Sequence, residues 1–180
     1  MTATAADDGW MQTLTGKKFY PLNPTLDSID IIDIAGALSK MCRFGGHCNK
    51  FYSISEHCWH LSYKASPPNR LAALMHDASE AYIADIVRPI KPHLQNYRAI
   101  EDGLMEKIAE KFDFDWPLPQ EVKHLDLGIL SDEREQNMTC MNVESLVWGN
   151  ILPAIGVKLK FWAPPVAQEM FLERFFELRG

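Results

Sequence analysis

Hydrophobic residues recur at helical spacing in several separate stretches of this chain. The first clear stripe consists of Ile31, Ile34, Ala35, Leu38 and Met41. Because residues three and four apart share one face of an α-helix, this stripe predicts a helix over residues 28–42. Asp27 or Ser28 would cap its start, since both side chains accept hydrogen bonds from free backbone amides.

The same spacing predicts five further helices. They cover residues 56–63, 70–88, 97–112, 121–138 and 166–178. Ser53 or Ser55 would cap the first of these helices, and Pro89 and Pro92 would end the second. No stretch shows a convincing alternation of apolar and polar residues, so we expect an all-α fold. The length suits one helical domain over residues 1–180.

Three segments lack helical spacing. Residues 1–9 are expected to form a loose N-terminus, and residues 148–165, with three prolines, an irregular connection. Residues 10–24 combine aromatic side chains with a glycine and two prolines, which predicts an extended or hairpin-like segment. Its aromatic residues are expected to pack against the protein rather than to stack on bases. They are Trp10, Phe19 and Tyr20.

Composition and charge narrow the classes of function. The net charge of −6 argues against nucleic acid as the main partner, although a local cationic pocket could still bind a small anion. No apolar run approaches the roughly 20 residues that span a bilayer, and the first residues do not resemble a secretory signal. We therefore expect a cytoplasmic protein without a membrane partner. Reduced thiols are expected, and a cysteine-rich zinc site is disfavoured, for Cys42, Cys48, Cys58 and Cys140.

Ionisable residues are concentrated among apolar residues in the segment 74–91. They are His76, Asp77, Glu80, Asp85 and Lys91. A helix through this segment would place His76 and Glu80 on one face, four residues apart. Burying so many charges is costly unless they are compensated, and a metal ion with an anionic substrate is the usual compensation.

Two further residues extend this group to a candidate metal site. His57, the pair His76-Asp77 and Asp126 each lie in a different apolar helix, so they could converge on one cation. His57 by itself would more often be a structural histidine. Together, two imidazoles and two carboxylates form a nitrogen and oxygen site that suits Mn²⁺, Fe²⁺, Co²⁺ or Zn²⁺, and Mg²⁺ less well.

This arrangement resembles the ligand pattern H…HD…D of the HD-domain phosphohydrolase superfamily. The similarity runs from about residue 13 to 135 and is greatest to small bacterial and phage 5′-deoxynucleotidases and deoxynucleotide triphosphohydrolases. It rests on three parts of the chain. The first is residues 52–57, the second is residues 76–80 followed by Asp85 and residues 89–91, and the third is residues 122–126. The resemblance implies one divalent metal ion, with Glu80 and Asp85 as acid and base candidates. The implied metal ligands are His57, His76, Asp77 and Asp126.

The resemblance also implies how a deoxynucleotide would be bound and cleaved. Arg43 and Phe44 resemble an arginine–aromatic pair near phosphate and sugar, and Gly45-Gly46 would let their turn approach a ligand closely. Glu80 would position or deprotonate the attacking water, while Asp85 would protonate the leaving oxygen or recognise the 3′-hydroxyl. The charge of the phosphate would be neutralised by Arg43, Lys91 and His47.

Several alternatives stay open from the sequence. The substrate could be a monophosphate, which is slightly favoured, or a triphosphate, including dATP in enzymes of phage type. An HD phosphodiesterase for cyclic or hyperphosphorylated nucleotides and a non-catalytic nucleotide-binding module are further alternatives. Base preference and the native metal are undetermined.

The sequence also predicts two features of the surface. The acidic cluster 132–135 is expected to be a solvated helix face, although the resemblance would place Glu133 and Arg134 near the metal ligands. The last helix is expected to support a homo-oligomer through Phe171, Phe175 and Phe176.

Overall fold

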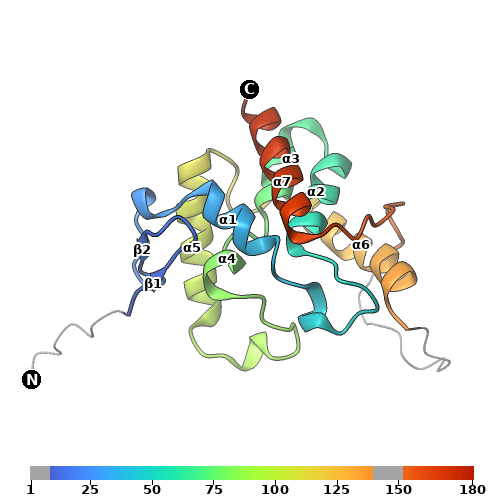
Figure 1. Ribbon diagram of the computed structural model, residues 1–180, viewed down its shortest axis with the longest axis horizontal. Helices are drawn as coiled ribbons and strands as arrows, with labels where there is room; N and C mark the ends of the chain where they lie inside the picture. Colours follow the sequence, from blue (N-terminus) through green and yellow to red (C-terminus); the bar gives the residue numbers. More distant parts are fainter. Residues whose placement is uncertain (1–8, 140–151) are drawn as a thin grey trace, which may run out of the picture.

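The computed structural model describes residues 9–139 and 152–180, and helices dominate it (Figure 1). This confirms the prediction of a mainly helical fold. The predictions for residues 1–8, residues 148–151 and Cys140 fall outside the described residues. The α-helices are α1 (Ile31–Leu38), α2 (Ile54–Lys64), α3 (Arg70–Met75), α4 (Glu80–Ile83), α5 (Tyr97–Phe112), α6 (Gln120–Asn137) and α7 (Pro164–Arg179). The short 3-10 helices are η1 (Leu26–Ser28), η2 (Arg43–Gly46), η3 (Pro67–Asn69) and η4 (Lys91–His93).

The predicted extended segment near the N-terminus is a small hairpin. Strands β1 (Met11–Gln12) and β2 (Lys18–Phe19) pair antiparallel. Phe19 is buried, and its ring stacks on Tyr82 of α4 with centroids 3.9 Å apart. Trp10 and Tyr20, in contrast, are 48% and 38% exposed, so the packing prediction was wrong for these two aromatics.

The helix predicted over residues 28–42 is shorter than expected. It covers Ile31–Leu38, and Asp30 rather than Asp27 or Ser28 is its cap, accepting a hydrogen bond from the Ile32 amide at 2.9 Å. Asp27 and Ser28 instead lie in η1. The buried Asp33 of this helix accepts hydrogen bonds from the amide and hydroxyl of Thr15. This contact ties the hairpin to α1.

The helix predicted over residues 70–88 is interrupted, which corrects the expectation of one continuous element. Helix α3 ends at Met75, α4 begins at Glu80, and turns connect them. Within these turns, backbone amides bond to the carbonyl three residues back, as in Ala78 to Met75 and Glu80 to Asp77. The chain leaves α4 at Ala84, whose φ is 65°, well before the prolines that were expected to end the helix.

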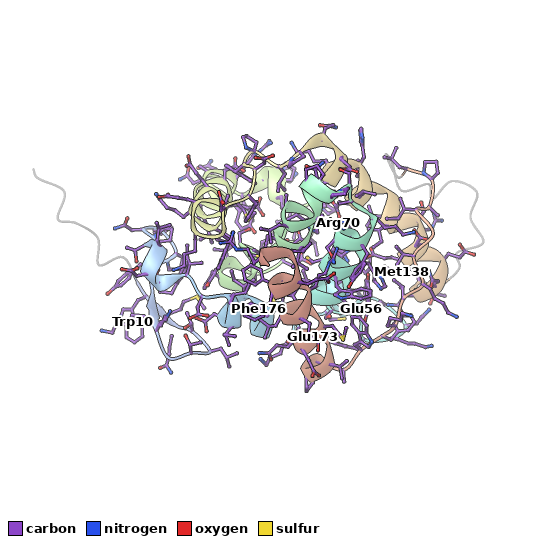
Figure 2. The ribbon with its side chains drawn as sticks, turned by 90° about the horizontal axis from the view of Figure 1, so that it is seen from above. Trp10, Glu56, Arg70, Met138, Glu173 and Phe176 are labelled. Carbon is purple, nitrogen blue, oxygen red and sulfur yellow. The ribbon has the colours of Figure 1, made fainter. Side chains whose placement is uncertain are left out.

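Helices α2 and α3 pack closely together in the middle of the molecule, and α7 contacts both α1 and α2. In Figure 2, Trp10 and Met138 lie towards opposite ends, with Glu56 and the α7 residue Phe176 between them. One buried cluster joins the hairpin, α1, α2, α3, α4, α5 and α7, while a second joins α2, α3, α6 and residues 155–161. The turn between α3 and α4 is therefore held by packing on several sides.

Two buried carboxylates attach the segment before α7 to the bundle. Glu56 of α2 accepts hydrogen bonds from the successive amides of Lys160, Phe161 and Trp162, at 2.6–3.0 Å. Asp132 of α6 accepts from the amides of Ile155 and Val157. Residues 152–163 are non-helical, in line with the irregular connection expected there, but Pro164 and Pro165 already belong to α7. Because Asp132 and Glu133 are both buried, the prediction of a solvated acidic face was wrong for these residues.

The last helix also differs from its predicted role. Phe171 and Phe175 are buried in the core, because α7 packs across α1 and α2, and Phe176 alone of the three aromatics is exposed, at 57%. The proposed apolar interface therefore loses two of its three residues. Among the described residues, none of the helices combines the length and the apolar character needed to cross a bilayer.

Candidate metal centre

Two histidines face each other at the centre of the bundle. His57 lies on α2, and its Nδ1 is 2.7 Å from the Glu133 carboxylate, while His76 Nδ1 is 2.8 Å from the Ala73 carbonyl. Both partners are acceptors, so each Nδ1 is the donor of its bond and Nε2 is the ring nitrogen that faces the other histidine. These two Nε2 atoms lie 3.2 Å apart. Their lone pairs require a cation or a proton between them.

Two carboxylates complete this group of donor atoms. Asp77 Oδ2 lies 3.2 Å from His76 Nε2 and 3.8 Å from His57 Nε2. Asp126 Oδ1 of α6 lies 3.3 Å from His57 Nε2 and 3.9 Å from His76 Nε2. Ligands about 2.1 Å from one ion stand roughly 3–4 Å from one another. The donor atoms of His57, His76 and Asp126 all lie within 4.8 Å of one another and could hold a shared divalent cation, whereas Asp77 forms a second such group with His76 and Cys58. The four predicted ligand residues are thus brought together.

The break between α3 and α4 explains how adjacent residues reach one centre. In a regular α-helix successive side chains point about 100° apart. The tight turns after Met75 allow His76 and Asp77 to direct their donor atoms to the same point. Asp77 remains 21% exposed and Asp126 27% exposed, whereas His57 is fully buried. The donor set is therefore open on its carboxylate side.

Charges within the site affect each other strongly. Burial opposes ionisation of Asp77, but His76 and Arg43 outweigh it and hold the pKa of that carboxyl below its ordinary value. Burial also opposes protonation of His76, but the nearby Asp77 carboxylate raises the pKa of that imidazole. The site thus attracts positive charge, as a metal centre does.

Arg43 and Glu133 form a second layer behind His57. Arg43 Nη2 donates to Glu133 Oε2 at 3.1 Å, and Arg43 Nη1 lies 3.7 Å from Asp77 Oδ2. Glu133 is fully buried, yet Arg43 and His57 keep its pKa below the ordinary value against the effect of burial. An ionised Glu133 fixes the orientation of His57 and increases its basicity towards a metal.

A cavity of about 210 Å³ opens beside the donor atoms. Its polar side includes His76, Asp77, Glu80, Lys91, Glu101 and Asp126, and its apolar wall is formed by Met105, Trp116, Leu118 and Val122. Lys91 Nζ lies 2.9 Å from Glu101 and 3.6 Å from Glu80 Oε1. Burial, with repulsion from Asp77 and Asp85, raises the pKa of Glu80 to about 9. Near neutral pH the Glu80 carboxyl is therefore mainly protonated, and added positive charge beside it would be needed to favour its ionised form.

The remaining predicted site residues are less closely gathered. The Phe44 ring lies 5.2 Å from the Arg43 guanidinium carbon, and its own φ is 59°. Asp85 influences Glu80 electrostatically but does not line the cavity. His47 is exposed at the end of η2 and is also outside the cavity lining, because the turn directs it to solvent. The structure therefore does not bring His47 into the site.

Several residues of this site were not identified from the sequence. Cys58 lies close enough to His76 and Asp77 for its thiol to be a ligand, although burial raises its pKa above the ordinary value. Glu101 and Trp116 line the cavity, but Glu101 resembled an ordinary polar position of an amphipathic helix. No sequence spacing connects residues 101 and 116 to the metal ligands, so only the fold could reveal them.

Comparison with known proteins places the chain among relatives of similar length. No family model matches it. It is 35% identical over 173 residues to uncharacterized protein YfdR of Escherichia coli strain K12, covering 94% of this chain and 95% of YfdR. It is 32% identical over 182 residues to uncharacterized protein RCAP_rcc00048 of Rhodobacter capsulatus, covering 92% of this chain and 93% of that protein. The chain therefore belongs to the same protein family as YfdR and RCAP_rcc00048.

Proposed function

We propose that this protein is a metal-dependent phosphohydrolase of the HD-domain type that acts on 2′-deoxynucleotides. The observation that carries the proposal is the convergence of two imidazole Nε2 atoms and two carboxylates beside a cavity. The contributing residues are His57, His76, Asp77 and Asp126. Mixed nitrogen and oxygen ligands with an open side suit Mn²⁺, Co²⁺, Fe²⁺ or Zn²⁺.

The proposed reaction breaks the bond between the α-phosphorus and the 5′-oxygen. A divalent cation supplies positive charge that polarises the phosphoryl group and favours ionisation of water. A cation held by the neighbouring ligands would add to Lys91 Nζ, 3.6 Å away, in favouring the ionised form of Glu80, which then accepts the proton of the attacking water. Since Asp85 lies outside the cavity lining, we assign return of that proton to the leaving oxygen to Glu80 as well.

The charges around the cavity favour a monophosphate over a triphosphate. Two lysines line it, Lys91 and Lys123, against the five acidic side chains of Asp77, Glu80, Glu101, Asp102 and Asp126. Each additional phosphate would bring further negative charge beside these carboxylates without added positive partners.

One assay separates this proposal from its alternatives. The protein is incubated with Mn²⁺, Co²⁺ or Mg²⁺ and a panel of dNMPs, dNTPs, NMPs, cyclic nucleotides and hyperphosphorylated guanosine nucleotides, and products are separated by chromatography. We expect equal amounts of deoxynucleoside and inorganic phosphate from dNMPs, lost on chelation and in Asp77→Ala. Release of triphosphate from dNTPs would favour the alternative of a triphosphohydrolase. Cleavage confined to cyclic or hyperphosphorylated nucleotides would favour the alternative of an HD phosphodiesterase. If no substrate is consumed in a metal-dependent reaction, the enzymatic proposal is overturned.

A further inference from the structure

Two cysteine thiols meet at the base of the turn that carries Arg43. Cys42 and Cys48 stand on either side of η2, and their Sγ atoms lie 3.6 Å apart. Both residues are partly buried, and Cys48 Sγ donates to the Lys50 carbonyl at 3.1 Å. This close approach results from the fold of the turn, because the two cysteines do not form a recognisable sequence motif.

We propose that Cys42 and Cys48 form a reversible disulfide that changes the position of Arg43 in response to a low-molecular-weight disulfide such as oxidised glutathione. The Cys42 thiolate attacks one glutathione sulfur, forming a mixed disulfide and releasing one glutathione thiol. The Cys48 thiolate then attacks Cys42 Sγ and releases the second glutathione. Two electrons pass from the protein to the oxidant, and each released glutathione sulfur takes up a proton.

The geometry of the turn permits this bond. A disulfide is about 2.05 Å long, so the two sulfurs must approach by roughly 1.5 Å from their separation of 3.6 Å. Gly45 and Gly46 are exposed and have φ values of 59° and 83°, so the turn between the cysteines can adjust at low cost. Burial, with a hydrogen bond to Cys42, raises the pKa of Cys48 to about 11, which is why we assign the first attack to Cys42.

Arg43 is coupled to this bond because both ends of the turn are anchored. On one side the Arg43 amide donates to the Tyr52 carbonyl at 2.9 Å, and its guanidinium contacts Glu133. On the other side, the amides of Asn49 and Lys50 bond to Asn137 at the end of α6. Cys42 directly precedes Arg43. Moving Cys42 towards Cys48 should therefore displace Arg43 relative to Tyr52 and Glu133, to which it is bonded. Its effect on turnover rests on the proposed function. Arg43 does not line the cavity, and it would act through Glu133 and through Asp77, which lies 3.7 Å from its Nη1.

The test compares the full-length protein in reduced and oxidised glutathione. We expect loss of two hydrogens by mass spectrometry, a peptide map linking Cys42 to Cys48, and slower amide hydrogen exchange within residues 43–47. With dNMP and Mn²⁺, kcat/KM should fall on oxidation, by up to about 100-fold for a displacement of roughly 1 Å, and recover with dithiothreitol. Cys42→Ser and Cys48→Ser should remove this response, while Cys140→Ser should retain it.

The outcomes separate the two proposals. If the Cys42–Cys48 link is absent at saturating oxidised glutathione, or if Cys140→Ser abolishes it, the dithiol proposal is overturned. If the link forms in an active enzyme without changing kcat/KM, control of Arg43 is overturned. If the link forms and slows hydrogen exchange but neither redox state hydrolyses any nucleotide, the dithiol stands and the proposed function fails.

Discussion

Glu80 and Glu133 are both buried carboxylates near the same histidines, but their surroundings differ. Glu133 contacts Arg43 and His57, which favour its ionised form and keep its pKa below the ordinary value despite burial. Glu80 is buried near Asp77 and Asp85, which raise its pKa, with Lys91 opposing them. The same functional group is therefore suited to orient a ligand in one case and to exchange a proton in the other.

We expect Glu80→Gln to retain metal and lose turnover. The amide keeps the size of the side chain but cannot take a proton, so kcat should fall roughly 10²–10⁴-fold. Mn²⁺ affinity, measured by calorimetry, should change little. Glu106→Gln, an exposed change on α5, is the matched control. A loss of Mn²⁺ affinity as large as that in Asp126→Ala would make Glu80 a ligand instead.

Glu133→Gln should weaken metal binding, although Glu133 is not itself one of the predicted metal ligands. Its carboxylate accepts from His57 Nδ1 at 2.7 Å and thus orients the ring that presents Nε2. Loss of such a partner lowers metal affinity by about 10–100-fold. Calorimetric titration with Mn²⁺ checks this value, with circular dichroism to verify folding. Glu135→Gln, an exposed change on the same helix, should bind Mn²⁺ with the affinity of the parent protein. Equal Mn²⁺ affinities in Glu133→Gln and Glu135→Gln would contradict the role of Glu133 in orienting His57.

The turns between α3 and α4 show why a local irregularity matters for the site. A continuous helix over residues 70–88 would satisfy the hydrophobic pattern, but it would point His76 and Asp77 in different directions. The structure ends α3 at Met75 and resumes at Glu80, which brings both side chains to one centre. Packing of the flanking Leu74, Met75 and Ala78 in the core stabilises this break.

Glu56→Ala should destabilise the attachment of the segment before α7. The carboxylate accepts three backbone hydrogen bonds, from residues 160, 161 and 162, and alanine leaves these amides without that acceptor. We expect the free energy of unfolding, measured with urea, to fall by about 2–4 kcal/mol. Glu56→Gln should lose less, since an amide oxygen still accepts. A change below about 0.5 kcal/mol in the alanine variant would contradict this role.

The contact between η3 and α6 should give a measurable dependence of stability on pH. Hydrogen bonds from Ser66 and Asn69 lower the pKa of Glu121 below 4.5 in the folded state. A depressed carboxyl pKa contributes stability that is complete above the unfolded pKa and is lost as pH falls through the folded pKa. Glu121→Gln should therefore cost up to about 1 kcal/mol at pH 7 in this largely exposed site.

The loss of stability caused by Glu121→Gln should become smaller as the pH falls below 4.5, where Glu121 of the parent protein becomes protonated. Urea denaturation of both proteins at pH 7 and at about pH 3 checks the sign. Glu106→Gln serves as the exposed control. A difference between Glu121→Gln and the parent that is unchanged at the lower pH would show that ionisation of Glu121 does not matter.

The candidate metal centre joins α2, the α3–α4 turn and α6, so cation binding should stabilise the whole molecule. A ligand that binds only the folded state at about 100 times its Kd adds roughly 2.7 kcal/mol. For a chain of 180 residues this corresponds to a rise in Tm of about 5–10 °C. Differential scanning calorimetry with Mn²⁺ should show this rise, and chelation should reverse it. The same rise in Asp126→Ala would place the bound ion elsewhere.

Much of the architecture could be read from the chain because local patterns govern it. The helix predicted over residues 97–112 has these bounds in the structure, and Ser53 caps α2 as one of two predicted candidates. The residues of the candidate site could also be named from the sequence, because histidine and carboxylate are unusual on apolar helices, and the structure brings their side chains close together. Periodicity failed where tertiary contacts prevailed, as at Asp30, which caps a helix predicted to begin earlier.

The sequence by itself determined a helical protein with two histidines and two aspartates capable of holding a cation, since side-chain chemistry and hydrophobic spacing are local properties. Only the tertiary structure decided that the Nε2 atoms of His57 and His76 face each other and that Glu133 is buried beside His57. It also decided that Trp116 lines the cavity. It also brought Cys42 and Cys48 within 3.6 Å. These features depend on how distant segments pack, and packing follows from the combined burial of the whole chain rather than from spacing within any one helix.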